Sequence, residues 1–298
     1  MKAVDFSKQV HFYSPYNTPV LYVDSGESVL FKCQDTYNDL LTDENCRVGR
    51  EMAGIALNPL NGPVYVNGAM PGDTIKITIE DIHITSDYAT MVVNDSLVLK
   101  GFVPFVTDEQ VIKIPLRDGF ADVFGNQIKL DPFPGCLGIA PSEKISTMFP
   151  GAHGGNMDCK KLTQGSEFYI PVAVPGALVT TGDIHAFQGD GEIVCGLEVA
   201  GEVQLKLDVI KGRAERWPIL KTKDRWYVIA SCPTMEEASH EAVTSMERFV
   251  LKRLNRYTPH QLMIVLSQLA DIEVCQIVDP LVTMRFGLDS CAVKELEF

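Results

Sequence analysis

Two-residue alternation of apolar and polar side chains is the feature that most constrains the fold of this 298-residue chain. It dominates the sequence up to about residue 215 and is broken repeatedly by Gly, Pro and Asn. Within 203–209, for example, Val and Leu occupy the odd positions and Gln, Lys and Asp the even ones. Alternate side chains of a strand point to opposite faces of the sheet, so one face is buried in the core and the other is exposed to solvent. Many short strands joined by turns predict a mainly β protein with a β-sandwich core.

Helical spacing replaces this alternation in the last third of the chain. Thr234 and Glu237 have the spacing of a capping box, and apolar residues then recur every three or four positions as far as Leu254. Thr258, followed by Pro and then Gln261, repeats the pattern before a shorter apolar stretch. The sequence therefore predicts two helices, of which the first is the longer.

Two apolar segments of strand length, 226–230 and 272–278, flank the predicted helices. We therefore expect a β-sandwich domain over residues 1–215 and an α+β segment over residues 216–298 that packs on it. No linker rich in Pro or Ser separates the two parts. A single domain with one shared core is the alternative.

The charge of the chain argues against several classes of partner. The 39 acidic and 26 basic side chains give a formal charge of -13, which repels nucleic acids and anionic membranes. No apolar run approaches the roughly 20 residues that cross a bilayer, and the first ten residues lack the apolar core of a signal peptide. We expect a cytoplasmic protein with neither nucleic acid nor a membrane as its partner.

The first candidate site lies in a glycine-rich loop, Pro150-Gly-Ala-His-Gly-Gly-Asn-Met-Asp158. Glycine allows positive φ and close approach of the backbone to another group. His153, Asn156 and Asp158 can therefore converge on one point from a short loop, and loops of this kind commonly carry function. The loop predicts metal-binding side chains rather than a mere connection.

The second candidate site lies in the stretch from Gly182 to Glu192. If its first residues are extended, Asp183 and His185 point to the same face, because side chains two apart in a strand share a side. Imidazole and carboxylate groups suit zinc or a similar divalent ion, with calcium as the alternative, and an open ligand position would make the site catalytic. The predicted ligands from both stretches are His153, Asp158, Asp183 and His185.

Other readings of these residues stay open. Asp190 in its glycine-rich turn is equally well explained as an Asx-turn former, and buried imidazoles can be satisfied by carboxylates without a metal. Cys159, followed by two lysines, suggests a nitrilase-like Cys-Lys-Glu site, although no matching Glu loop is apparent. A covalent mechanism is therefore the weaker alternative.

Several motifs together resemble the acetamidase/formamidase family. They occur in the family's order and cover most of residues 10–210. As they stand in this sequence, they are Gly62-Pro-Val-Tyr-Val-Asn-Gly-Ala-Met-Pro-Gly-Asp73, Pro134-Gly-Cys-Leu-Gly-Ile-Ala-Pro141, His153-Gly-Gly-Asn-Met-Asp158, Pro171-Val-Ala-Val-Pro-Gly-Ala177 and Gly182-Asp-Ile-His-Ala-Phe-Gln-Gly-Asp-Gly-Glu192.

The resemblance implies hydrolysis of a short aliphatic amide, such as formamide or acetamide, to ammonia and a carboxylate. It also implies a β-sandwich core and a homodimer. Asp35 stands where the family has an acidic residue after its second strand, and it is carried over as a further metal ligand. His11 precedes Phe-Tyr instead of the Trp-Asp pair that family members show, so its part in the site is left open.

The expected mechanism follows from the ligand types. A divalent ion polarises the amide carbonyl and lowers the pKa of water, so that water can attack at neutral pH. Glu192, with Asp190 behind it, is the candidate for proton transfer to the leaving nitrogen. Gln188 and Asn156 are the candidates for binding the substrate. Hydrolysis of another C–N bond, as in a cyclic amide, and non-catalytic binding of a metal or small ligand are the alternatives.

Overall fold

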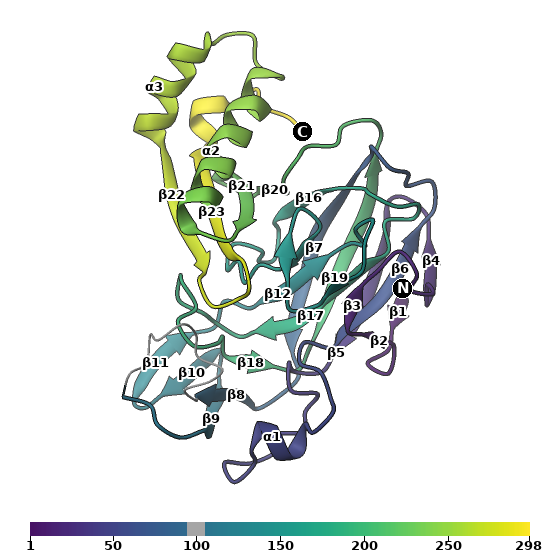
Figure 1. The fold of residues 1–298 in the computed structure, drawn as a ribbon, viewed down its shortest axis with the longest axis vertical. Coiled ribbons are helices and arrows are strands. Elements are labelled where there is room, and N and C mark those ends of the chain that lie inside the picture. The colour runs from purple at the N-terminus through teal and green to yellow at the C-terminus, as the bar shows by residue number, and fades with distance from the viewer. Residues whose placement is uncertain (94–104) are drawn as a thin grey trace.

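Two large, mostly antiparallel sheets form the body of the computed structural model, which describes residues 1–93 and 105–298 (Figure 1). The first sheet has nine of the described strands. In sheet order, they are β1 (Lys2–Val4), β5 (Glu27–Cys33), β19 (Gly201–Ile210), β7 (Thr74–Ile84), β16 (Glu167–Pro171), β20 (Ile219–Lys221), β21 (Arg225–Cys232), β23 (Val282–Asp289) and β22 (Ala270–Gln276).

The second sheet has twelve of the described strands and is branched. Its main path is β11 (Asn126–Lys129), β10 (Phe120–Val123), β9 (Gln110–Arg117), β8 (Tyr88–Val93), β18 (Glu198–Val199), β17 (Val179–His185), β12 (Phe133–Gly138), β15 (Gly154–Asn156) and β14 (Pro150–Gly151). The branch on β17 consists of β6 (Leu60–Val66), β2 (Gln9–Val10) and β4 (Leu21–Val23), and a separate small ribbon pairs β3 (Phe12–Tyr13) with β13 (Ile145–Ser146).

The main core lies between these sheets. Ile77 and Leu205 of the first sheet and Val64 and Ile184 of the second are fully buried in one apolar cluster. Two inner faces that meet in a shared core define a sandwich. The prediction of a mainly β fold with a C-terminal α+β segment is therefore confirmed.

The C-terminal helices begin where their caps predict. The described helices are α1 (Val48–Glu51), α2 (Met235–Leu251) and α3 (Pro259–Leu269), with a short 3₁₀ turn, η2 (Ser290–Val293). The Thr234 hydroxyl accepts from the Glu237 backbone N–H, and Thr258 and Gln261 form a complete capping box. Among the described helices, none has the length and apolarity that crossing a bilayer requires.

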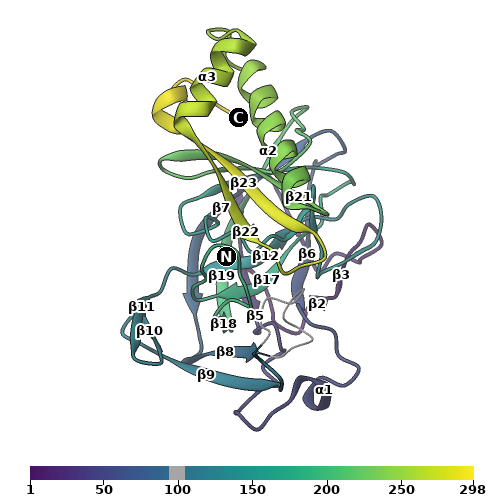
Figure 2. The same cartoon turned by 60° about the vertical axis from the view of Figure 1, so that its left-hand side comes forward.

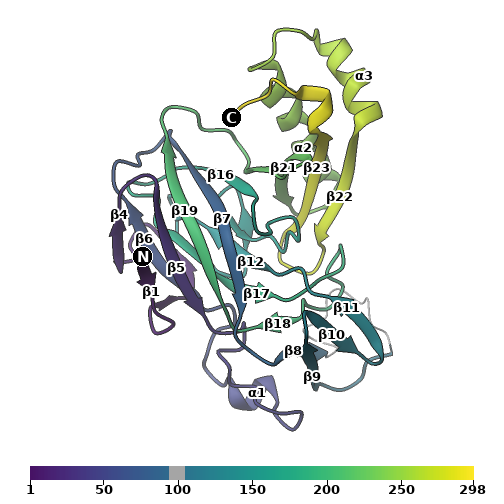
Figure 3. The same cartoon turned by 180° about the vertical axis from the view of Figure 1, so that it is seen from behind.

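The C-terminal strands extend the first sheet past residue 215, while α2 packs on β21 and β23 to form a second apolar core (Figure 2). Phe249 of α2 and Val228 of β21 are both fully buried there. The turn between β22 and β23 points away from the helices and reaches the sandwich beside β12, as Figures 1 and 3 both show. This turn brings the C-terminal segment to the candidate site.

Candidate active site

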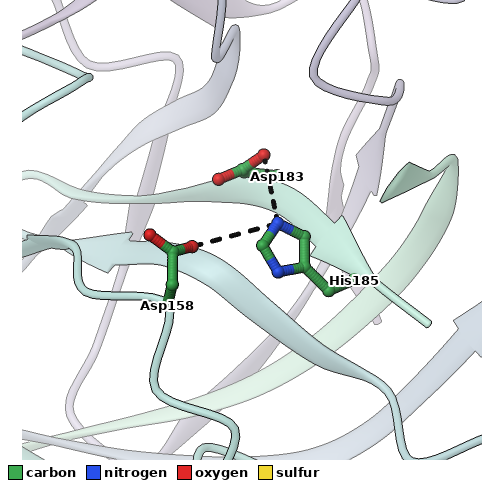
Figure 4. Close-up of side chains that lie close together, drawn as sticks. All are labelled: Asp158, Asp183 and His185. Carbon is green, nitrogen blue, oxygen red and sulfur yellow. Dashed lines mark ion pairs between the residues drawn. The ribbon is translucent and has the colours of Figure 1, made fainter. Parts of the chain in front are cut away.

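The candidate site is built on the antiparallel pair β12 and β17. Phe133 of β12 pairs with His185 of β17, and Cys136 pairs with Gly182. The loop that follows β15 returns to β12, where the Asp158 backbone N–H donates to the Gly135 carbonyl at 3.2 Å. Asp158 is thereby brought over the strand that carries Asp183 and His185, as Figure 4 shows.

The Nε2 atom of His185 is the centre of this cluster. It lies 3.1 Å from a carboxyl oxygen of Glu198, 3.6 Å from one of Asp183 and 3.9 Å from one of Asp158. The imidazole and all three carboxyl groups are buried. In Figure 4, Asp158 and Asp183 approach the same ring nitrogen from two sides.

Gln188 fixes the other side of the His185 ring. Its Oε1 lies 2.7 Å from Nδ1 of His185, and its Nε2 donates to the Asp158 carbonyl at 3.1 Å. Since Gln188 accepts at Oε1, Nδ1 carries the donated proton, and Nε2 of the neutral ring keeps the lone pair that a metal requires. A single side chain therefore orients the imidazole and ties it to the Asp158 segment.

Two glycines leave room for these side chains. A Cβ atom at Gly135 would lie 2.5 Å from Oδ1 of Asp158 and 2.8 Å from Oδ2 of Asp183. A Cβ atom at Gly196 would lie 2.3 Å from Nδ1 of His185. Such contacts are too short for any side chain, so glycine at both positions is what lets the cluster form.

Three acidic residues of the site have left-handed backbones. The φ angles are 45° at Asp158, 56° at Asp183 and 43° at Glu192. Positive φ is uncommon outside glycine, and such residues persist only where the surrounding structure enforces them. The fold therefore holds these carboxyl groups in place at an energetic cost.

A cavity of about 160 Å³ opens beside the cluster. Its polar wall includes Asp183, His185, Glu192, Glu198, Asn156 and Asp279. Its apolar wall includes Leu57, Val92, Met148, Val194, Val278 and Pro280. A small concave space with an apolar wall and a few convergent polar groups is the usual form of a substrate site.

Burial and mutual repulsion shift the pKa values of the acidic groups. Burial, reinforced by the negative charge of Asp158, raises the pKa of Glu192 well above its ordinary value. Burial also raises the pKa of Glu198 well above its ordinary value, and that of Asp158 to about 6. Burial alone would lower the pKa of His185, but the carboxylates of Glu198 and Asp183 outweigh it and raise that pKa. Such closely packed acids need either protons or a cation.

The hydrogen bonds of the cluster test whether a divalent cation would fit. Asp158 Oδ1, Glu192 Oε2 and Glu198 Oε2 are buried and have no hydrogen-bond partner among the described residues. Buried polar atoms are normally paired, so atoms left unpaired call for a ligand. Carboxylate oxygens beside an oriented imidazole nitrogen are a suitable donor set for a divalent ion. Asp158, Asp183 and His185 lie close enough together to share one, as do His185, Glu192 and Glu198.

The structure brings together three of the four principal ligands predicted from the sequence, Asp158, Asp183 and His185. His153 lies elsewhere on the glycine-rich hairpin, with its ring edge-on to Tyr13 at a centroid distance of 4.7 Å. Burial lowers the pKa of His153 to about 4. It forms no ion pair with the carboxylates of the described residues, unlike His185.

Asp35 and Asp190 also lie apart from the cluster around His185. Asp35 is buried and accepts from the backbone N–H groups of Tyr37 and Asp39, which is the geometry of a turn-forming Asp. Asp190 is partly exposed, and it pairs with Lys160 at 3.1 Å and with Arg285 at 2.8 Å. These contacts give both carboxylates structural partners of their own.

Asn156 and Gln188, predicted to bind substrate, have different surroundings. Asn156 faces the cavity, and its Nδ2 donates to Asp279 at 2.8 Å while its Oδ1 accepts from Asn58 at 3.1 Å. Gln188 lies behind His185, where both ends of its amide are engaged. Asn156 is therefore the one of the two that a substrate can reach.

The sequence analysis missed Glu198 and Asp279. Glu198 is the residue of β18 that pairs directly with His185 of β17. A predicted antiparallel pairing of these two strands would have placed Glu198 opposite His185, so the sequence did contain an indication of this contact. Asp279 lies in the turn between β22 and β23, where Asp followed by Pro indicates only a turn.

The sequence matches the model of a family described as the acetamidase/formamidase family, over residues 7–149 and 143–237. The match includes the loop with Asp158 and the strand with Asp183 and His185. It also reaches α2, the first C-terminal helix.

Solved structures agree with this match over the whole chain. A crystal structure of an acetamidase from Bacillus halodurans has a TM-score of 0.94 and 33% identity, and covers 99% of this chain and 100% of that one. A predicted acetamidase/formamidase from Thermoanaerobacter tengcongensis has a TM-score of 0.94 and 30% identity, with coverage of 100% and 99%.

One curated relative is similar over a short stretch only. A formamidase from Methylophilus methylotrophus is 44% identical over 82 residues, which are 27% of this chain and 20% of that protein. The chain spans at most 61% of the length of the curated relatives that it matches.

Proposed function

The chain belongs to the acetamidase/formamidase family, and we propose that it hydrolyses short aliphatic amides such as formamide and acetamide to ammonia and a carboxylate. The observation that carries this proposal is the buried group of carboxyls around His185 Nε2, beside a cavity of about 160 Å³. This cavity is small compared with the roughly 300–1,000 Å³ of pockets for drug-sized ligands. It suits a substrate of few heavy atoms.

Asp158, Asp183 and His185 are the residues we propose to hold a divalent cation. The imidazole favours Zn²⁺ over Ca²⁺, because Ca²⁺ takes oxygen ligands whereas Zn²⁺ readily takes His nitrogen. When bound there, the ion would polarise the substrate carbonyl and lower the pKa of water. The unpaired oxygen of Asp158 and the oriented Nε2 of His185 support this assignment.

Glu192 is proposed to deliver a proton to the leaving nitrogen, since an amide anion is too basic to depart. Burial and the charge of Asp158 raise the pKa of Glu192, and this direction favours the protonated form that a general acid requires. A cation beside Asp158 would offset part of that shift. A positioned acid of this kind is typically worth about 10²–10⁴-fold in rate.

Gln188 and Asn156 receive separate roles in this proposal. Gln188 orients His185 through Nδ1 and does not line the cavity. Asn156 faces the cavity and is retained as a substrate contact. The proposal also includes the homodimer and cytoplasmic location expected from the sequence, which sedimentation and cell fractionation would test.

The decisive experiment combines elemental analysis of the purified protein with ammonia release from formamide, acetamide, propionamide and urea. We expect bound zinc, ammonia from formamide and acetamide, less from propionamide and none from urea. Chelation should abolish turnover, and added Zn²⁺ should restore it. His185→Ala should lose both metal and turnover, whereas His83→Ala, at an exposed position of β7, should lose neither.

Two results would overturn the proposal in different ways. Bound metal without ammonia release from any amide would indicate a non-catalytic binding protein. Full turnover without metal would instead exclude the cation from the mechanism.

A further inference from the structure

The segment that carries Glu192 has little packing of its own. Glu192 follows Gly189, Asp190 and Gly191, and a Cβ atom added at Gly189 would meet nothing within 4 Å. At Gly191, where φ is 99°, an added Cβ would meet only Ile193, at 3.9 Å. Glycine leaves a backbone free to move. The left-handed φ of 43° at Glu192 therefore needs support from outside the segment.

The support comes from the C-terminal hairpin of β22 and β23. The Gly191 N–H donates to the Cys275 carbonyl at 3.0 Å, and the Ile277 N–H donates to the Gly191 carbonyl at 3.1 Å. This two-bond bridge joins the segment to the hairpin just before its turn. Figures 1 and 3 show that turn lying against the sandwich.

Arg285 makes the corresponding side-chain contact. It lies on β23 with its side chain 0% exposed, and its Nη2 donates to Asp190 Oδ2 at 2.8 Å. The same guanidinium contacts Glu273 through Nε at 2.7 Å and donates to the Val274 carbonyl at 3.0 Å. All three guanidinium nitrogens therefore donate hydrogen bonds, and a lysine side chain cannot reproduce this geometry.

Lys160 extends the network to the other side of the site. Its Nζ lies 3.1 Å from the same Oδ2 of Asp190, and it follows Asp158 by two residues. Asp190 thus joins the segment of Asp158, the segment of Glu192 and the C-terminal hairpin. A buried arginine with two acidic partners is weak evidence for stability, because desolvation offsets much of the attraction. The position of Arg285 instead suggests that it fixes the relative positions of the segments that Asp190 joins.

We infer that Arg285 is a positioning residue for Glu192, which it holds at the cavity through Asp190. The inference rests on the proposed function for its effect on turnover, but not for its effect on the backbone. Asp190 then serves to anchor the Glu192 segment, whereas the sequence analysis placed it behind Glu192 as a second candidate for proton transfer. The C-terminal segment, in turn, becomes part of the active site.

The test uses the full-length protein and three variants. Arg285→Lys keeps the charge but loses the guanidinium fork, and Asp190→Asn removes the charge of the anchor at a partly exposed position. Arg225→Lys is the matched control, because Arg225 binds the other oxygen of Glu273 at 3.0 Å on the same sheet and does not touch Asp190. Amide hydrogen exchange of residues 189–193, kcat and KM for acetamide, and metal content are measured for each.

In Arg285→Lys and Asp190→Asn, we expect faster amide hydrogen exchange at residues 189–193. We also expect kcat to fall by about tenfold or more, because small displacements of a reacting group are costly. KM should stay within about twofold of the wild-type value. Metal content should not change. The double variant should lose no more than the worse single variant, because both act through one contact. Arg225→Lys should match the wild type.

Unchanged exchange in Asp190→Asn would overturn the inference whatever the activity, and so would losses that multiply in the double variant. If Arg285→Lys does not fold, Asp190→Asn decides alone. A wild-type protein that releases no ammonia would count against the proposed function, whereas the exchange measurement would still judge the positioning role.

Discussion

The surroundings of the two buried histidines, His185 and His153, differ in the number of carboxyl groups beside each ring. His185 Nε2 lies within 4 Å of three carboxyl groups, and its pKa is raised. His153 lies against Tyr13, has no acidic partner among the described residues, and has a pKa lowered to about 4 by burial. Burial alone disfavours the charged form of an imidazole, whereas neighbouring carboxyl groups favour positive charge beside them.

The different positions of His153 and Asp158, which belong to one short loop, result from the backbone geometry between them. Gly154 and Gly155, with φ of 84° and 89°, separate His153 from the rest of its loop. The chain turns there, so that Asp158 reaches β12 while His153 stays on the outer hairpin. Two ligands predicted from one short loop therefore lie in different environments.

The largest expected effect comes from crowding the His185 side. Gly135→Ala places a Cβ atom 2.5 Å from Asp158 Oδ1 and 2.8 Å from Asp183 Oδ2, so both carboxyl groups must move. We expect turnover of acetamide to fall by more than about 10²-fold, together with metal content, because displacement by about 1 Å can cost that much. Gly151→Ala, where the Cβ would lie 3.0 Å from His153 Nδ1, is the matched control. Equal activity of the two variants would contradict the proposed site around His185.

The next effect concerns the proton that Glu192 is proposed to deliver. Glu192→Gln keeps the shape of the side chain but cannot supply that proton, so kcat should fall by about 10²-fold while metal content stays. Glu202→Gln, whose carboxylate on β19 pairs with Lys32 on the neighbouring strand β5, is the control. An unchanged kcat would remove Glu192 from the mechanism, and lost metal would make it a ligand instead.

The fold was predictable from local patterns, and so was part of the site. Alternation revealed the strands, threonine caps located α2 and α3, and the two-residue spacing of Asp183 and His185 brought those side chains together. Each of these signals lies within a few residues of sequence. The pairing of sheets and the second core depend on contacts between distant segments, which no local pattern contains.

The same limit explains the residues that were missed. Glu198 meets His185 only because β17 pairs with β18, and Asp279 meets Asn156 across 123 positions of sequence. The anchoring of Asp190 by Arg285 spans 95 positions. The left-handed backbone at Asp158 and Glu192 is likewise imposed by tertiary contacts and not by residue type.

A smaller effect concerns how His153 makes the free energy of unfolding depend on pH. Because its folded pKa of about 4 lies below the ordinary 6.5, the unfolded chain takes up a proton that the folded chain does not, and stability is lost as pH falls from 6.5 toward 4. By pH 5 this loss is about 2 kcal/mol, from the difference in pKa. His153→Gln removes it, so urea unfolding of that variant should depend less on pH than that of the wild type. An equal pH dependence would show that His153 takes up a proton in the folded protein as readily as in the unfolded chain.

The smallest expected effect compares two buried cysteines. Cys159 is fully buried beside Arg285 and Cys275 and does not line the cavity, whereas Cys136 Sγ lies 2.7 Å from Asn156 Oδ1 and 3.5 Å from Asp183 Oδ2. Cys159→Ala should leave turnover within about twofold and cost about 1 kcal/mol of stability, as for a small buried group. Cys136→Ala should lower turnover several-fold by loosening Asn156. If Cys159→Ala instead abolishes turnover with fold and metal intact, the nucleophile is the thiol and the reaction is covalent.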